Sequence, residues 1–65
     1  MIDWYKVYYG KSSRQFNKEK EAVQFFLACV LSGLQCSIVR VLTIHNPLED
    51  TMLTHAFELS KVEGR

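Results

Sequence analysis

The sequence predicts a small two-layer α+β domain, in which one helix lies on one face of a sheet and the elements run strand, strand, helix, strand, strand. Residues 4–9, WYKVYY, are aromatic-rich and alternate as a strand does. Residues 18–32 carry apolar side chains at helical spacing before Gly33. Residues 36–45, CSIVRVLTIH, form a long β-favouring run. Because a helix and a sheet bury their apolar faces against each other, two layers follow.

The first strand is predicted at residues 4–9, where successive side chains point to opposite faces. One face carries Tyr5, Val7 and Tyr9, and the other carries Trp4, Lys6 and Tyr8. Residues 10–13 have the composition of a turn. Residues 14–16 can then return as a short second strand, so the sequence predicts a hairpin.

The helix is predicted at residues 18–32, with Asn17 as its N-cap and Gly33 as its C-terminal stop. Leu27 and Leu31 fall outside its main apolar face. Because one sheet cannot cover this much apolar surface, we expect part of the helix to contact another subunit. The main face comprises Ala22, Phe25, Phe26, Cys29 and Val30.

Residues 36–45 are expected to form the central strand, which only Arg40 interrupts with a charge. A charge in such a strand must reach solvent, pair with a carboxylate or meet an anionic ligand. We expect Arg40 to serve binding, because a guanidinium suits phosphate; the alternative is that it neutralises an internal acid such as Glu58. With Val7 and Tyr9 facing the helix, the uncovered sheet face is expected to carry Trp4, Lys6, Tyr8, Ile38, Arg40 and Leu42.

Residues 46–50, NPLED, fit either the start of a helix or a hairpin loop. The following residues 51–59, TMLTHAFEL, alternate in polarity and contain two β-branched threonines, so a strand is favoured over a helix. Residues 1–65 are expected to form one domain, with a flexible tail at 61–65.

Composition limits the classes of partner. The chain has 65 residues and a formal net charge of +1, which disfavours duplex nucleic acid but leaves a small anion possible. Its longest apolar run, residues 22–31, is too short for a bilayer, and no leader pattern opens the chain, so a cytoplasmic protein without membrane partners is expected. Cys29 and Cys36 are expected to be buried, reduced thiols.

Catalysis is not expected, and neither a cofactor nor a metal ion is expected. His45 and His55 lie ten positions apart, and the spacing of the histidines, cysteines and acids fits neither metal ligands nor a nucleophile constellation. A single histidine beside a turn is more often a surface or packing residue than a functional one. Enzymatic activity is therefore the least favoured class.

The candidate binding residues are aromatic or cationic. Trp4 and Tyr8 flank Lys6 on the face that the helix is expected to leave open, although strands also use aromatic residues simply for packing. Lys11 and Arg14 flank the turn, where solvated loop charges are the simpler interpretation. The predicted ligand- or partner-binding set is Trp4, Lys6, Tyr8, Lys11, Arg14 and Arg40.

The pattern YKVYYG, RQFNKEKEAVQFFLACVLSG and CSIVRV, within residues 4–41, resembles short bacteriophage-encoded accessory proteins, some of which counter bacterial defence. Among such proteins are oligomeric sponges that sequester cyclic nucleotide signals. The resemblance therefore implies a nucleotide-binding oligomer acting in the host cytoplasm. It assigns no individual residue, because no ligand-binding motif of that family can be matched here.

The favoured function is a non-catalytic oligomer, a dimer or tetramer, that binds a compact anionic ligand such as a cyclic nucleotide signal. The alternative is a protein-binding inhibitor or adaptor that uses the open sheet face or an edge strand. A weak binder of single-stranded nucleic acid is a third possibility, since aromatic and cationic residues also serve that role.

Overall fold

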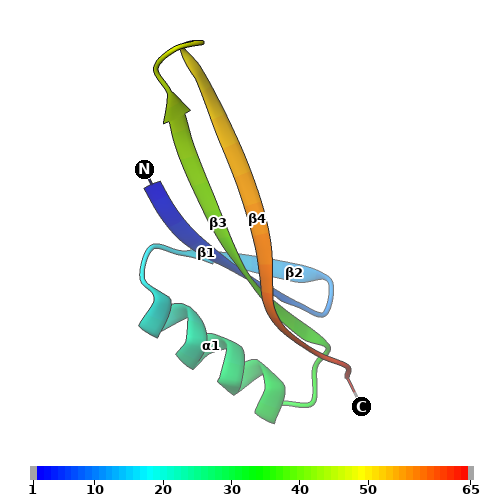
Figure 1. Ribbon diagram of the computed structural model, residues 1–65. Helices are drawn as coiled ribbons and strands as arrows, with labels where there is room; N and C mark the ends of the chain where they lie inside the picture. Colours follow the sequence, from blue (N-terminus) through cyan, green and yellow to red (C-terminus); the bar gives the residue numbers. More distant parts are fainter. Residues whose placement is uncertain (1, 65) are drawn as a thin grey trace.

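The computed structural model describes residues 2–64 and confirms the α+β fold with its predicted element order (Figure 1). One sheet contains all four strands in the order β2-β1-β3-β4, and every neighbouring pair is antiparallel. The elements are β1 (Ile2–Tyr9), β2 (Ser12–Phe16), α1 (Glu19–Leu31), β3 (Cys36–Asn46) and β4 (Thr51–Val62).

A two-residue loop joins β1 to β2, because Tyr9 pairs with Ser12. Gly10 takes a positive φ of 57°, a conformation that a glycine adopts without steric cost. The Gly10 amide also donates a hydrogen bond to the Gln35 carbonyl at 2.9 Å. This bond ties the β1–β2 turn to the loop that leads from α1 into β3.

The helix begins slightly later than its sequence predicts. Lys18, rather than Asn17, occupies the N-cap position, and no side chain caps the first turn. The C-terminus matches the prediction: Gly33 has a φ of 81°, and its amide donates to the Val30 carbonyl at 3.0 Å. The amide of Leu34 reaches back to the Cys29 carbonyl, which completes a Schellman-type end.

The core lies between α1 and the sheet, where the helix packs mainly on β1, β3 and β2. Val7 is fully buried at its centre, and the predicted helix face is confirmed, because Phe26 is only 6% exposed. Three aromatic rings close the edge of the core. The ring centroid of Phe25 lies 5.1 Å from that of Tyr9 and 5.3 Å from that of Phe16. The buried core residues are Tyr5, Val7, Ala22, Phe26, Cys29, Cys36 and Ile38.

The predicted face of β3 is wrong. Tyr5 pairs with Arg40 and Val7 pairs with Ile38, so the even-numbered residues of β3 share the helix-side face with the odd-numbered residues of β1. Ile38, Arg40 and Leu42 therefore do not lie on the open face. Both faces of β3 are rich in apolar residues, so its sequence pattern alone did not distinguish them.

The ambiguity after β3 resolves as a hairpin loop followed by a strand. Asn46 Oδ1 accepts a hydrogen bond from the Leu48 amide at 3.1 Å, which shapes a loop that returns into β4. The register of β4 shifts at Ile38/Val39, so that Leu59 is an extra residue between Glu58 and Ser60. The strand β4 includes Lys61 and Val62, which the sequence predicts to lie in a flexible tail at 61–65. Arg65, the last residue of that predicted tail, lies outside the described residues.

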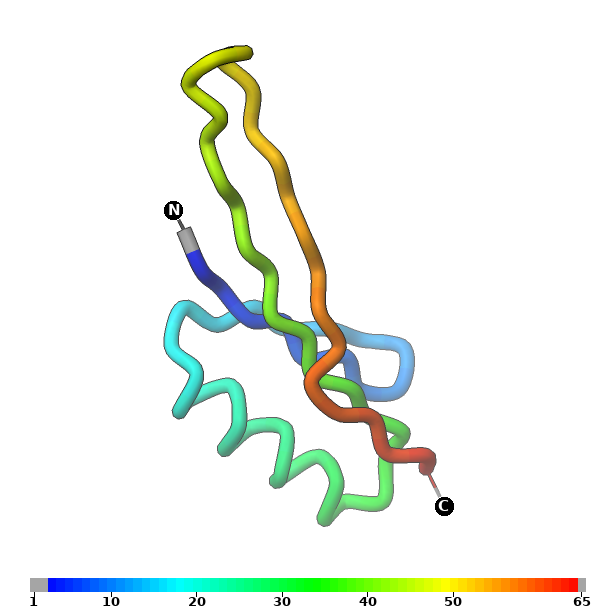
Figure 2. The backbone as a smooth tube through the Cα atoms, viewed as in Figure 1, coloured from blue at the N-terminus to red at the C-terminus, as the bar shows by residue number. Residues whose placement is uncertain are grey.

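The molecule is elongated, with principal extents of 47 × 18 × 16 Å (Figure 2). Within residues 2–64, the last pair between β1 and β3 is Ile2–Thr43, and beyond it the described sheet consists of β3 and β4. We call residues 44–53 the arm; it projects away from the end of the molecule that holds α1. Across residues 2–64, no helix has the length and apolarity required to cross a membrane.

Candidate binding surface on the open sheet face

The sheet face opposite α1 is ordered as three rows of side chains that run across the strands. The pairings of β1 with β3 and of β3 with β4 define them. Val41 is only 5% exposed although it lies outside the core cluster beneath the helix, because it sits in the row between Trp4 and Ala56. The rows are Trp4–Val41–Ala56, Lys6–Val39–Glu58 and Tyr8–Ser37–Lys61, and we call them the open face.

Trp4, Lys6 and Tyr8 lie together on the open face, as their alternation predicted. The Lys6 ammonium lies 5.1 Å from the centroid of the Tyr8 ring, within the range of a cation–π contact. Tyr8 is 43% exposed, so part of its ring remains available to a ligand. This pair presents an aromatic surface and a positive charge side by side.

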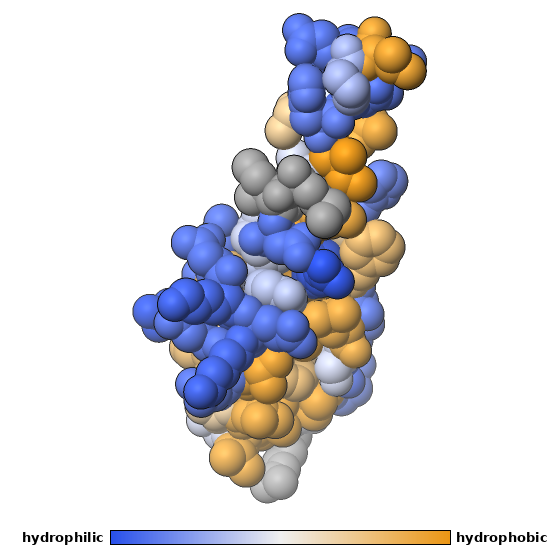
Figure 3. All heavy atoms as spheres, turned by 60° about the vertical axis from the view of Figure 1, so that its left-hand side comes forward, coloured by the Kyte–Doolittle hydropathy of each residue, from blue (hydrophilic) through white to orange (hydrophobic). Residues whose placement is uncertain are grey.

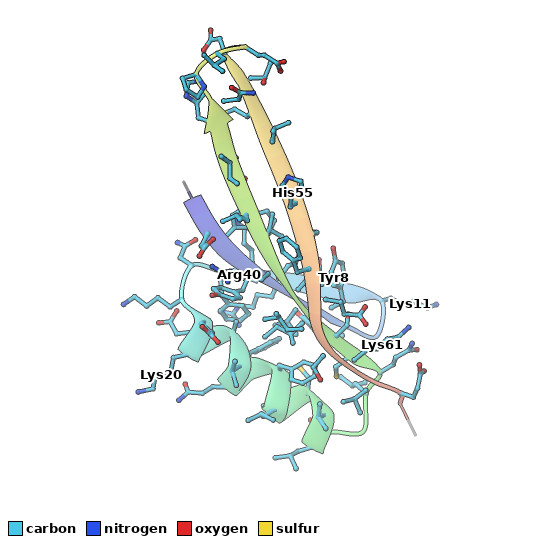
Figure 4. All side chains as sticks on the ribbon, in the orientation of Figure 1. Tyr8, Lys11, Lys20, Arg40, His55 and Lys61 are labelled. Carbon is cyan, nitrogen blue, oxygen red and sulfur yellow. The ribbon has the colours of Figure 1, made fainter. Side chains whose placement is uncertain are left out.

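A small hollow of about 150 Å³ adjoins Tyr8 at one end of the open face. Lys61 contributes to its wall and lies at the same end of the molecule as the β1–β2 turn (Figure 4). Its ammonium is 3.9 Å from Glu63 Oε1, and both side chains are at least half exposed, so this ion pair is weak. The hollow is smaller than sites for whole drug-sized ligands, and it suits one group of a larger ligand. Its lining residues are Tyr8, Gly10, Gln35, Cys36, Ser37 and Lys61.

Charge is unevenly distributed over this surface. Glu58 ends the middle row on β4, across Val39 from Lys6, so this row carries one charge of each sign. Lys6 is two positions from Tyr8 on the same face of β1, and Lys61 ends the row that Tyr8 begins. An anion is therefore favoured near Tyr8 and the hollow.

Arg40 lies on the other side of the sheet and forms an internal ion pair. Its Nη2 donates to Asp3 Oδ2 at 2.6 Å, and both side chains are partly exposed. This hydrogen bond is the main cause that raises the pKa of Arg40. The placement of Arg40 on the open face is thus corrected. It pairs with a carboxylate, as the alternative interpretation allowed, but the acid is Asp3 and not Glu58.

Tyr5 connects this ion pair to the helix. Its hydroxyl donates to Glu19 Oε2 at 3.4 Å across the interface between β1 and α1. Burial, with a further contribution from the Glu19 carboxylate, raises the pKa of the Tyr5 phenol. Arg40, Asp3, Tyr5 and Glu19 therefore form a polar border where α1 begins.

The two remaining predicted residues lie apart from the open face. Lys11 is exposed in the β1–β2 turn, near the hollow end of the molecule (Figure 4). Arg14 lies on the helix side of β2, and its guanidinium carbon is 5.4 Å from the ring centroids of both Phe16 and Phe25. Its stacking on core rings supports a packing role.

Sequence reasoning missed Lys61 and Ser37 as parts of this surface. The sequence places Lys61 in the predicted tail. The position of Ser37 follows only from its pairing with Tyr8 on β1 and with Lys61 on β4. The extra residue in β4 sets that register, and no pattern in the sequence marks it.

The thiols and histidines do not form a metal cluster within residues 2–64. Cys29 and Cys36 are free and buried, as predicted, and burial together with the neighbouring Cys36 raises the pKa of the Cys29 thiol. His45 Nε2 lies 3.2 Å from Asp50 Oδ1 at the base of the β3–β4 loop. His55 stacks on Phe57 with a centroid separation of 6.3 Å, on the helix side of β4.

Comparisons with protein-family models, with curated proteins and with solved structures gave no match to this chain. The arrangement of the residues themselves is therefore the basis for assigning a function.

Proposed function

We propose that this protein is a non-catalytic oligomeric binding protein that holds a small anionic, aromatic ligand such as a nucleotide on its open face. The observation that carries the proposal is the Lys6–Tyr8 cation–π pair, which leaves part of the Tyr8 ring exposed. A nucleobase can stack on an exposed ring, and a neighbouring ammonium can neutralise its phosphate. The proposed ligand-contacting residues are Trp4, Lys6, Tyr8, Ser37 and Lys61.

The hollow beside Tyr8 supports a compact anion over a long polymer. Its volume of about 150 Å³ suits a single phosphate or base, and Lys61 brings a second positive charge to its wall. The formal net charge of +1 supplies little long-range attraction for a polyanion. A cyclic nucleotide signal matches this chemistry, and in the setting that the sequence resemblance implies, the protein would be phage-encoded and would act in the host cytoplasm.

Intrinsic fluorescence offers a direct test, because Trp4 is the single tryptophan of the chain and lies on the open face. The protein is titrated with cyclic dinucleotides, mononucleotides and short oligonucleotides, and its unfolding midpoint is measured with each ligand. We expect a cyclic dinucleotide to change the fluorescence and to raise the midpoint. A ligand present at about 100 times its dissociation constant adds about 2.7 kcal/mol of apparent stability.

Variants assign the binding to the open face. Lys6→Met removes the charge but keeps an apolar stem, and it should weaken binding about ten- to a hundredfold through the loss of a charge-assisted contact. Lys20→Met is the matched control, because it removes the same charge from an exposed position on α1 (Figure 4). The proposal fails if no nucleotide in the panel binds at millimolar concentration, or if both variants reduce the affinity equally.

The unpaired outer edge of β4 favours a second candidate function, the protein-binding adaptor or inhibitor. Within residues 2–64, β4 pairs with β3 on one side only, through eleven of its twelve residues, and an extended segment of a partner protein can add to such an edge. A partner recognised in this way would bind normally to the Lys6→Met variant. The two functions are thus separable with one set of proteins.

A further inference from the structure

The N-terminal half of β4 lacks, on its outer edge, the features that normally keep an edge strand from pairing. Natural edges carry prolines, charges or bulges that discourage association. In β4 the bulge and both charged residues, Glu58 and Lys61, lie in its C-terminal half. The segment Thr51–Phe57 contains neither a proline nor a charged residue other than His55, which is neutral in the formal count.

Apolar side chains accompany this edge on the helix side of the hairpin. Leu53 is 47% exposed and Phe57 is 50% exposed, and Ile44 on β3 lies opposite Leu53. In Figure 3, hydrophobic residues extend along the molecule into its protruding upper end. Because an isolated two-stranded hairpin is marginally stable in water, the arm requires additional contacts.

The dimensions of the chain indicate how much surface is available for such contacts. The Cα radius of gyration is 13.6 Å, against about 10.7 Å for a compact domain of this length. The accessible surface is 4907 Å², about 600 Å² more than a typical folded monomer of this mass exposes. This excess is close to the roughly 800 Å² that each partner buries in a standard interface.

We propose that β4 pairs antiparallel with β4 of a second copy of this chain along residues 52–58, about a two-fold axis through His55. A two-fold axis perpendicular to the sheet reverses the strand direction and keeps each face on its own side, so paired residues must share a face. In the regular segment before the bulge, Leu53 of each copy then lies opposite Phe57 of the other copy, so the interface contains two such apolar pairs. The two four-stranded sheets then join into one continuous sheet.

The distribution of charge also favours a second copy of this chain as the partner that pairs with the outer edge of β4. In this register Glu58 faces Met52 of the other chain, so the pairing brings no two carboxylates and no two lysines opposite each other. A net charge of +1 per chain adds little repulsion between copies. The symmetry places both apolar pairs on the same face, where they cover the exposed parts of Leu53 and Phe57.

The inference deepens the oligomeric part of the proposed function, and it can be tested apart from ligand binding. The paired segment lies on β4, whereas Trp4, Lys6 and Tyr8 lie on β1, with β3 between the two strands. Lys61 lies beyond the paired segment. A dimer that binds no nucleotide overturns the ligand proposal alone, and a monomer that binds one overturns the interface alone.

Sedimentation velocity of the ligand-free protein from about 5 to 200 µM gives the first test. We expect a species of twice 7.6 kDa. Phe57→Lys should weaken association at least about thirtyfold, as the loss of an aromatic anchor at an interface centre does. Leu31→Lys is the matched control: Leu31 is an 86% exposed apolar residue on α1, so its replacement should leave the dimer intact. A monomeric parent protein overturns the inference, as does a dimer that only Leu31→Lys dissociates.

Cysteine cross-linking tests the position of the axis. His55→Cys places two thiols opposite each other at the two-fold, and mild oxidation should give a covalent dimer within minutes. Leu48→Cys is the control for random collision, because Leu48 is 95% exposed at the tip of the arm and is outside the paired segment. Cross-linking of Leu48→Cys that equals or exceeds that of His55→Cys excludes the proposed pairing.

Discussion

At the scale of single residues, Arg40 illustrates how a partner distant in sequence decides the role of a charge. Its strand pattern correctly required solvent, a carboxylate or an anion, but it did not identify which one. The pairing of Tyr5 with Arg40 also brings Asp3, which lies on the same face of β1, within 2.6 Å of the guanidinium. Position 3 is 37 residues away from position 40 in the chain, so no local pattern indicates this contact.

Arg40→Met should lower the free energy of unfolding only slightly and leave the proposed nucleotide binding unchanged. The loss is small because both side chains are partly exposed and solvent screens the pair. Urea unfolding and fluorescence titration on the same sample measure both quantities. Asp3→Asn in the Arg40→Met background should recover part of the loss, because it removes the unpaired carboxylate.

Unchanged stability of Arg40→Met beside a large loss of affinity would contradict this assignment. It would return Arg40 to the binding role that its sequence context favours, despite its position on the helix side of the sheet.

At the scale of elements, periodicity predicts α1 better than it predicts the strands. The main apolar face of α1 can be read from helical spacing even though Leu27 and Leu31 lie outside it, and the buried residues of the helix are among those this face contains. The strand β3 is apolar on both sides, so two registers remain possible until its pairing with β1 selects one. The open-face position of Trp4, Lys6 and Tyr8 was predictable from alternation, but their neighbours Ser37 and Lys61 depend on strand pairing.

Phe26→Ala should destabilise the domain by about 3 to 5 kcal/mol, enough to abolish folding in so small a chain. The side chain is 6% exposed and belongs to the same core cluster as the fully buried Val7, so truncation leaves a cavity in the core. Thermal or urea unfolding followed by circular dichroism measures the loss.

Leu27→Ala is the matched control for Phe26→Ala. Leu27 is adjacent on the same helix but 53% exposed, so we expect a change below about 1 kcal/mol. A larger loss at Leu27 than at Phe26 would show that α1 presents the opposite face to the sheet.

At the scale of the whole molecule, the two ends of the sheet differ in what supports them. At the α1 end, the sheet has four strands and a helix beneath it, whereas among the described residues the arm consists of β3 and β4. Stability within a protein varies in this way, and segments with few buried contacts open most easily. The pairing of β4 with a second copy would give a further strand to residues 52–58, which include the β4 residues at the base of the arm, so the stability of this segment would depend on protein concentration.

Hydrogen exchange should therefore separate the two ends. Every second amide between Met52 and Glu58 points to the outer edge of β4, and we expect its exchange to slow at least about tenfold between a dilute and a concentrated sample. Amides of Val7 and Ile38 serve as the internal reference, because they lie in the core and their protection follows global unfolding. Concentration-dependent protection of α1 in place of β4 would move the interface to the exposed side of the helix. Slow exchange of these β4 amides that does not depend on concentration would instead mean that the outer edge of β4 is protected without a partner, which would remove the structural reason for the dimer.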